Sequence, residues 1–294
     1  MSEAVAPALL ATPRAPGLNW RRAVPLLLVA PLVLFMLALY ALPVLAMLSR
    51  SLLEPAPTLS HYVELAGDEV FLHVFGNTLW TTVIVTAGTL LMGYPIALGM
   101  ARARRLLPLI LIVVLLPFWT SVLVRSYAWM VLLGRHGLVN EAMLALGLLD
   151  RPLRILNTPL AVHIAMIHIL LPYMILPIAN ALRQIDPSLA RAAAGLGAGP
   201  FGVFRQVTLP LSMPGVMAGV LLVFVLSLGF YITPALVGGP RDMTLSMLIA
   251  QRVEQLDWAY AATLSAVLLA TALAIIAVFQ RLFGVGTAFR MSAR

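Results

Sequence analysis

The sequence predicts an all-α membrane protein with six transmembrane helices and a cytoplasmic loop between the fourth and fifth of them. Two features of composition lead to this prediction: 62% of the 294 residues are hydrophobic, and only 10% are charged. An ordinary soluble domain carries about 25% charged residues, so most of this chain must face lipid or other apolar helices. The third observation is the presence of six apolar stretches that are long enough to cross a bilayer.

Each of these stretches approaches or exceeds the about 20 residues that a helix needs to cross the hydrocarbon core. In chain order they are Ala23–Leu48, Thr78–Met100, Leu106–Leu133, Pro159–Leu182, Met213–Val237 and Ala259–Phe279. The first follows arginines, as the core of a secretory signal does, but it exceeds the about 7 to 15 apolar residues of such a core. We therefore expect it to be retained as an anchor.

The arginines predict the orientation, because cytoplasmic segments are enriched in basic residues. If the N-terminus is cytoplasmic, six of the 19 arginines fall in outer segments, Arg125 falls in a span, and 12 fall inside. The inner ones are Arg14, Arg21, Arg22, Arg102, Arg104, Arg105, Arg183, Arg191, Arg205, Arg281, Arg290 and Arg294. Both termini are therefore predicted to be cytoplasmic. The outer segments are then 50–77, 134–158 and 238–258, with short helical or interfacial pieces.

The segment from Arg183 to Ser212 is much the longest predicted cytoplasmic connection between spans. Asp186 followed by Pro187 predicts the start of a short helix, because aspartate caps helices and proline favours the first helical position. Gly195, Gly197 and Gly199 predict a sharp turn after it, because glycine adopts positive φ without penalty. We also expect that a Cβ at Gly197 would clash in this corner.

A second short helix is predicted after the turn. Phe201, Val203, Phe204 and Val207 recur at near-helical spacing, which gives this helix an apolar face. We expect Pro210 and Pro214 to end it before the fifth span.

The segment IDPSLARAAAGLGAGPFGVFRQVTLPLSMPG, residues 185–215, resembles the cytoplasmic loop of permease subunits of bacterial ATP-binding-cassette importers. The motif of that family reads Glu-Ala-Ala, three residues, Gly, nine residues, an aliphatic residue, any residue and Leu-Pro. Arg191 stands in the place of the usual Glu, and the matching positions are Ala192, Ala193, Gly197, Val207, Leu209 and Pro210. NTLW (77–80), GYPIAL (93–98), PFWTSVLVRSYAWMVLLG (117–134) and LVGGPRDM (236–243) further resemble the first permease subunit of polyamine (spermidine/putrescine) uptake systems.

The resemblance implies a multi-pass, non-enzymatic subunit of the bacterial inner membrane that imports a small solute such as a polyamine by alternating access. The implied partners are a second homologous permease subunit, a dimer of ATPase subunits, an extracytoplasmic substrate-binding protein and the lipid bilayer, with no nucleic acid. ATP and Mg²⁺ would bind to the ATPase, and this chain would hold no cofactor. The implied ATPase-coupling residues are Asp186, Arg191, Ala192, Ala193, Gly197, Val207, Leu209 and Pro210.

The resemblance also implies a division of the chain. Residues 1–72 would form the cytoplasmic N-terminus, the first transmembrane helix and an extracytoplasmic loop. Residues 73–281 would form the permease domain of five helices with its coupling loop at 183–212, and residues 282–294 a cytoplasmic tail.

Arg125 is the only charged residue within the six stretches. It can snorkel to the outer interface, pack between helices, or lie on the solute path with its aromatic neighbours, and the sequence leaves these alternatives open. The possible path residues are Trp119, Arg125, Tyr127, Trp129 and Tyr231. No Asp or Glu lies in any stretch, so recognition of a cationic solute would depend on aromatic faces, a partner permease or a binding protein.

Other span residues indicate helix packing. His163 and His168 lie five residues apart, which places them on different faces of a helix and not at the spacing of a metal site. Gly215 and Gly219 form a small-xxx-small pair that favours close contact between helices.

Several other functions are disfavoured. There is no cysteine, so a thiolate site or disulfide is excluded, and the net charge of +8 is explained by loop arginines that set orientation better than by nucleic acid. GLGAG at 195–199 lacks the full dinucleotide fingerprint, and the chain has no phosphate-binding G-x-x-x-x-G-K-[ST] loop. A self-sufficient secondary transporter or channel is the main alternative, although such proteins use ionisable residues at midmembrane. A membrane-embedded enzyme lacks an acid, base or metal cluster to support it.

Overall fold

The computed structural model describes residues 20–54, 57, 59–103, 105 and 107–283, and the regular elements within these ranges are all helical. Five of the described helices are long and apolar enough to cross a membrane, and a bent helix pair makes six if it counts as one span. The predicted all-α membrane fold is therefore confirmed. The expected cytoplasmic residues Arg14, Arg104, Arg290 and Arg294 lie outside the described ranges.

The chain divides into two compact units, Met1–Ser49 and Arg50–Arg294. In the first unit, α1 (Trp20–Met36) passes through a π-helical turn, η1 (Leu37–Ala41), into α2 (Leu42–Leu53), which continues into the second unit. Pro43 explains the turn, because proline has no N–H and its ring crowds the carbonyl one turn earlier. Residues Leu28–Leu53 match the predicted first span in length and hydropathy.

The second unit contains the remaining elements. They are α3 (Ser60–Gly67), α4 (Glu69–Arg102), α5 (Leu107–Leu115), η2 (Leu116–Trp119), α6 (Val122–Leu132), α7 (Leu138–Ala145), α8 (Pro159–Arg183), α9 (Pro187–Gly195), α10 (Pro200–Val203), η3 (Phe204–Thr208), α11 (Leu209–Leu228), α12 (Ile232–Val237), α13 (Leu245–Glu254) and α14 (Trp258–Phe283).

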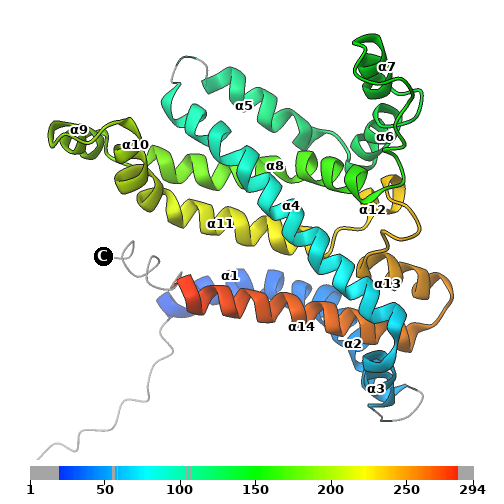
Figure 1. Cartoon of the computed structure of the whole chain (residues 1–294). Helices are drawn as coiled ribbons and strands as arrows, with labels where there is room; N and C mark the ends of the chain where they lie inside the picture. Colours follow the sequence, from blue (N-terminus) through cyan, green and yellow to red (C-terminus); the bar gives the residue numbers. More distant parts are fainter. Residues whose placement is uncertain (1–19, 55–56, 58, 104, 106, 284–294) are drawn as a thin grey trace, which may run out of the picture. The chain divides into compact units, whose positions relative to one another are not determined.

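Helices α4, α8 and α11 pack side by side and form the main core of this unit (Figure 1). Two glycines let α11 approach α8 closely. A Cβ at Gly215 would lie 2.5 Å from the Ala181 Cβ and 2.6 Å from the Pro177 carbonyl oxygen, and one at Gly219 would lie 2.9 Å from the Met174 sulfur. The predicted small-xxx-small contact is therefore confirmed.

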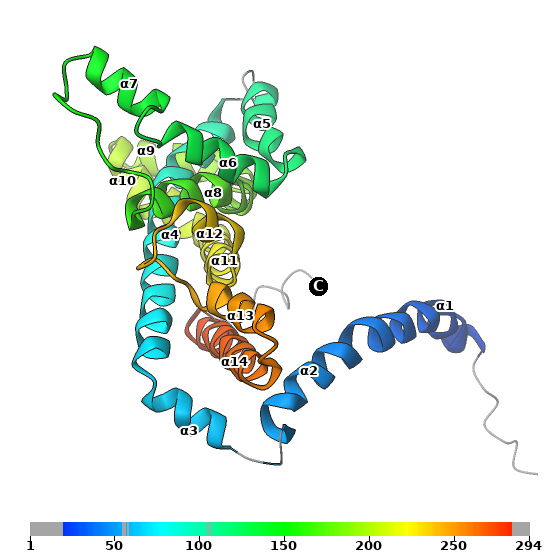
Figure 2. The ribbon, with the colours of Figure 1, turned by 90° about the vertical axis from the view of Figure 1, so that its right-hand side faces the viewer.

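A second, smaller core lies where α13 and α14 pack together beside the N-terminal half of α4 (Figure 2). Its fully buried side chains include Leu245 and Leu264. Two hydrogen bonds join α4 to the start of α13: the Asn77 side-chain amide donates to the Met243 carbonyl at 2.9 Å, and the Leu245 N–H donates to the Thr78 hydroxyl at 2.8 Å.

The third predicted span, Leu106–Leu133, is wrong as a single helix. α5 ends at Leu115, η2 follows, and α6 begins at Val122 after a bend of 101°. Pro117 removes a helical hydrogen-bond donor, and Ser121 starts a new helix by accepting a hydrogen bond from the Leu123 N–H at 3.2 Å. These local signals interrupt a run whose hydropathy alone predicted a continuous helix.

The fifth predicted span, Met213–Val237, has different bounds. The chain is helical from Pro200 to Leu228 and breaks before α12, so Val237 belongs to a separate short helix. The expectation that Pro210 and Pro214 end the second loop helix is also wrong. The π-helical turn η3 directly precedes Pro210 and accommodates its ring, and Pro214 lies within α11.

Segments that the arginine pattern assigns to opposite sides of the membrane lie at opposite ends of the second unit. The C-terminal ends of α4 and α8 and the start of the helical run through α11 line one cavity. At the other end, the Asn157 N–H donates to the Val237 carbonyl at 3.0 Å, and the Ser246 hydroxyl donates to the Phe230 carbonyl at 2.8 Å. The spans of this unit therefore alternate in direction as predicted.

Candidate functional site

Residues 186–207 form the central part of the predicted coupling loop at 183–212, and we name this part the docking loop. It begins as the sequence predicts. Asp186 caps α9, since its carboxylate accepts a hydrogen bond from the Ser188 N–H at 2.8 Å. This hydrogen bond, assisted by the nearby charge of Arg191, holds the pKa of Asp186 below its ordinary value. The carboxylate is therefore ionised at neutral pH, which maintains the cap.

Gly197 forms the corner between α9 and α10. Its φ is +90°, and the Gly197 N–H donates to the Ala194 carbonyl at 3.0 Å while the Ala198 N–H donates to the Ala193 carbonyl at 3.1 Å. This pair of hydrogen bonds is the Schellman motif, whose left-handed position favours glycine. The predicted clash of a Cβ is wrong, because no atom lies within 4 Å of its position. Backbone conformation, and not lack of space, requires the glycine. Gly195 and Gly199 do not have positive φ.

The docking loop lies at one end of the second unit (Figure 1). Its large apolar side chains include exposed ones. No residue of α9, α10 or η3 is buried. Leu196 is 90% exposed and Phe201 is 73% exposed, on either side of the Gly197 corner. Exposed apolar side chains that gather in one region are typical of surfaces that contact another protein or the membrane.

The other predicted coupling residues lie on α9, η3 and α11. Arg191, Ala192 and Ala193 lie on α9, where the first two are exposed and Ala193 is half-buried. Val207 lies in η3, and Leu209 and Pro210 begin α11. The helical run from Pro200 continues to Leu228, so the second half of the loop is continuous with α11.

Tyr94 joins the docking loop to α4, a contact that sequence reasoning missed. Its hydroxyl is hydrogen-bonded to the Ser212 hydroxyl at 2.9 Å, and its ring meets the Phe204 ring edge to face with centroids 6.0 Å apart. The two partners lie more than 100 positions away in the sequence, and only the position of Tyr94 within GYPIAL marked it as notable. α4 and α11 are thus both attached to the end of the docking loop.

Three of the five possible path residues lie on α6, and a fourth directly precedes α12, which packs against α6. Arg125, Tyr127 and Trp129 lie on α6, and Tyr231 precedes α12, which is joined to α6 by the hydrogen bond between the Ser126 and Thr233 hydroxyls at 2.8 Å. Trp119 lies on the other side of the bend, in η2, and is 81% exposed.

Arg125 and Trp129 have different surroundings on α6. The buried Nε of Arg125 has no hydrogen-bond partner among the described residues. The Trp129 indole donates to His168 Nδ1 at 3.2 Å, and the two rings meet edge to face. His168 therefore packs against α6, and sequence spacing gave no signal for this contact. The described residues contain no group of three or more His, Asp or Glu side chains placed to hold a metal ion.

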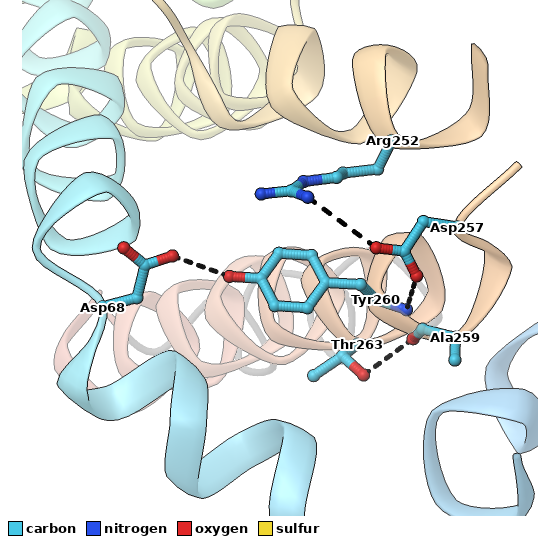
Figure 3. Close-up of polar contacts among 6 residues, drawn as sticks. All are labelled: Asp68, Arg252, Asp257, Ala259, Tyr260 and Thr263. Atoms are coloured by element: carbon cyan, nitrogen blue, oxygen red, sulfur yellow. Dashed lines mark hydrogen bonds and ion pairs between the residues drawn. The ribbon is translucent and has the colours of Figure 1, made fainter. Parts of the chain in front are cut away.

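A polar network joins α4, α13 and α14 at the opposite end from the docking loop (Figure 3). The Tyr260 hydroxyl donates to the Asp68 carboxylate at 2.8 Å, and the Arg252 guanidinium lies over the Tyr260 ring, 4.6 Å from its centroid. Arg252 also pairs with Asp257 at 3.7 Å. The hydrogen bond from Tyr260 is the largest cause that holds the pKa of Asp68 below its ordinary value.

Comparison with known proteins gives a family match over most of the chain. Residues 90–284 match the family described as binding-protein-dependent transport system inner membrane component. The chain is 36% identical over 210 residues to the spermidine/putrescine transport system permease protein PotB of Escherichia coli, covering 71% of this chain and 76% of that protein. It is 40% identical over 193 residues to PotB of Haemophilus influenzae, covering 65% and 67% of the two chains.

The fold is also similar to that of a chain in the crystal structure of a bacterial alginate ABC transporter in complex with an alginate pentasaccharide-bound periplasmic protein. The TM-score is 0.72 with 20% sequence identity, and the match covers 89% of this chain and 94% of the other. At this level of identity the similarity concerns the fold alone.

Proposed function

The chain belongs to the family of binding-protein-dependent transport system inner membrane components, and on this premise we propose that it imports a polyamine with energy from a separate ATPase. The family membership makes it a non-catalytic permease subunit of an ATP-binding-cassette importer. It favours this function over the alternative of a self-sufficient secondary transporter or channel.

The exposed corner of the docking loop carries the proposal of coupling to an ATPase. A helix, a left-handed glycine and a second helix present Leu196 and Phe201 outward, and no side chain of α9 or α10 is buried. A cleft on an ATPase subunit would cover these apolar groups. Movement of that cleft would then displace α11 through the continuous helix and α4 through Tyr94. Alternating access follows if this displacement changes which end of the helix bundle is open.

The polyamine substrate is proposed from the two relatives named as spermidine/putrescine permeases. No Asp or Glu lies within the apolar stretches of the sequence, so charge pairing within this subunit does not select a cation there. Aromatic faces at Tyr127, Trp129 and Tyr231 provide cation–π contacts, and Arg125 lies beside them on α6. We therefore assign most of the selectivity to a substrate-binding protein and to a second, homologous permease subunit.

The arrangement in the inner membrane follows from the arginine distribution. We place the docking loop and both termini in the cytoplasm, and α7, α12 and α13 on the outer side. The division into residues 1–72, a permease domain at 73–281 with its loop at 183–212, and a tail at 282–294 is part of this proposal. Each of the two ATPase subunits would bind the docking loop of one permease subunit.

Reconstitution tests the proposal. The chain, its permease partner, the ATPase and the binding protein are placed in liposomes, and uptake of radiolabelled spermidine is measured with enclosed ATP or a non-hydrolysable analogue. We expect uptake with ATP only, and competition by putrescine but not by sulfate. Uptake without ATP hydrolysis would contradict the proposed mechanism, and competition by sulfate alone would contradict the proposed substrate.

A pair of charge substitutions tests the docking surface. Leu196→Asp is expected to reduce both copurification of the ATPase and ATP-dependent uptake by at least about 10-fold. The reason is that a charge would replace the apolar side chain that the ATPase cleft would bury. The control is Leu148→Asp, since Leu148 is 66% exposed in the segment after α7, at the other end of the unit. Equal effects of the two substitutions would contradict the assignment.

A further inference from the structure

A cavity of about 570 Å³ lies between the docking loop and the ends of two transmembrane helices. Arg102 at the end of α4 and Arg183 at the end of α8 line it, as do Asp186 and Ala190 of the docking loop. The volume is far larger than a single water molecule needs. Two cationic side chains therefore line one cavity, at the C-terminal ends of two helices that are long and apolar enough to cross a membrane.

Among the residues that the structure describes, neither arginine forms an ion pair with an acidic side chain. Both are exposed, and the ion pair found among the described side chains is that of Arg252 with Asp257, at the other end of the unit. Asp186 also lines the cavity and contributes one negative charge, and one of its carboxylate oxygens accepts the hydrogen bond from the Ser188 N–H. The two arginines outnumber this carboxylate, so the lining residues carry a net positive charge, and guanidinium groups favour bidentate contacts with phosphate.

The rest of the wall is largely apolar. Leu98, Leu107, Leu182 and Ile185 come from α4, α5, the end of α8 and the connection to α9. A cavity lined by two arginines and by several apolar side chains is complementary to an amphiphile with a negative head, and much less so to a free inorganic ion.

We propose that this cavity binds an anionic phospholipid, with its phosphate between Arg102 and Arg183 and the beginning of an acyl chain along the apolar wall. Basic pockets between transmembrane helices on the cytoplasmic side attract such headgroups. Because Asp186, Pro187 and Ala190 line the same cavity, the lipid would contact the beginning of α9 and help to hold the docking loop. The binding site does not depend on the proposed function, whereas its effect on ATP hydrolysis rests on it.

Native mass spectrometry tests the binding directly. The full-length chain, with any partner subunits that copurify, is delipidated in neutral detergent and titrated with phosphatidylglycerol or phosphatidylcholine. Each arginine near an anionic lipid increases the affinity for that lipid about 5-fold. The double variant Arg102→Gln, Arg183→Gln is therefore expected to bind phosphatidylglycerol about 30-fold more weakly than the wild type. Binding of phosphatidylcholine is expected to be unchanged.

The matched control is Arg281→Gln. Arg281 is an exposed arginine in the last turn of α14 that does not line the cavity. It is expected to leave phosphatidylglycerol affinity at the wild-type value. Unchanged affinity in the double variant, or an equal loss in the control, would overturn the proposed site.

A second readout separates binding from coupling. ATP hydrolysis by the assembled transporter is measured in nanodiscs with and without phosphatidylglycerol, and the lipid is expected to stimulate the wild type but not the double variant. Loss of lipid binding without loss of stimulation would overturn the link to the docking loop and retain the site. An assembled wild type without ATP hydrolysis in any lipid would contradict the proposed function, while the mass-spectrometric result would still decide the site.

Discussion

Gly197 combines a φ of +90° with open space around its Cβ position. We predict that Gly197→Ala keeps the chain in the membrane but lowers ATP-dependent uptake about 10-fold, because a residue with a Cβ in this conformation costs about 1–3 kcal/mol and shifts the corner. Quantitative immunoblotting and vesicle uptake measure the two effects.

Gly195→Ala is the control for this prediction. Gly195 also has no atom within 4 Å of its Cβ position, but it lies in the last helical turn of α9 and has no positive φ. Its uptake should equal that of the wild type. Equal losses for both substitutions would show that small size, and not the left-handed backbone, is what the loop requires.

The hydrogen bond between Tyr260 and Asp68 predicts a defined pH dependence. The pKa of Asp68 is lowered in the folded protein, mainly by this bond, so the bond stabilises the fold above the pKa of the unfolded state, about 3.9, and the stabilisation is lost as pH falls through the folded-state pKa. Tyr260→Phe should therefore reduce stability by about 1 kcal/mol at pH 6, and this deficit should shrink as the pH is lowered below about 3.9. Thermal unfolding in detergent over a series of pH values below 6 measures the change. A deficit that does not shrink in the acidic range would contradict this role.

Single residues were predictable where the signal is local. The cap at Asp186 and the turn glycine at 197 follow from short-range backbone chemistry, although the physical reason for the glycine was not the expected one. The contacts of Tyr94 with Ser212 and of Trp129 with His168 were not predictable, because they join positions 118 and 39 residues apart. Such pairs depend on how helices pack, and hydropathy does not specify that.

The contact between α8 and α11 gives a prediction about helix packing. Gly215→Ala should lower the free energy of unfolding by about 1–3 kcal/mol, because the new methyl group would lie 2.5 Å from the Ala181 Cβ. Gly229→Ala is the control, since Gly229 ends the same helix and has no atom within 4 Å of its Cβ position. Thermal unfolding of the two variants in the same detergent measures the difference. A control that unfolds as early as Gly215→Ala would contradict the packing explanation.

Helix boundaries were predictable where an apolar run ends in polar residues, as at Arg183, and less so where it does not. The break at residues 116–121 lies inside an apolar run, so the hydropathy of the sequence does not reveal it. The local structure is decided by the proline and by the serine cap. The opposite error occurred at Pro210, where a π-helical turn lets the helix continue. The effect of a proline on a helix thus depends on the backbone conformation of the residues that precede it.

The predicted orientation of the whole molecule is testable without background labelling, because the chain contains no cysteine. Single cysteines at Leu196 and Leu146 are matched probes, since these side chains are 90% and 73% exposed at opposite ends of the second unit. In vesicles that contain the chain without its ATPase, a membrane-impermeant maleimide should label the Leu196→Cys protein only when the vesicles are inside-out and the Leu146→Cys protein only when they are right-side-out. The reverse pattern would contradict the cytoplasmic placement of the docking loop.

In the proposed mechanism the docking loop transmits the action of a separate ATPase to the membrane helices. Crosslinking from the Leu196→Cys protein in native membranes, followed by mass spectrometry of the adduct, tests whether the loop and the ATPase are in contact. We predict an adduct with an ATP-binding-cassette ATPase subunit whose yield changes when ATP is added, and no such adduct from the Leu146→Cys protein. An assembled transporter that takes up spermidine with ATP but gives no ATPase adduct from position 196 would contradict the account.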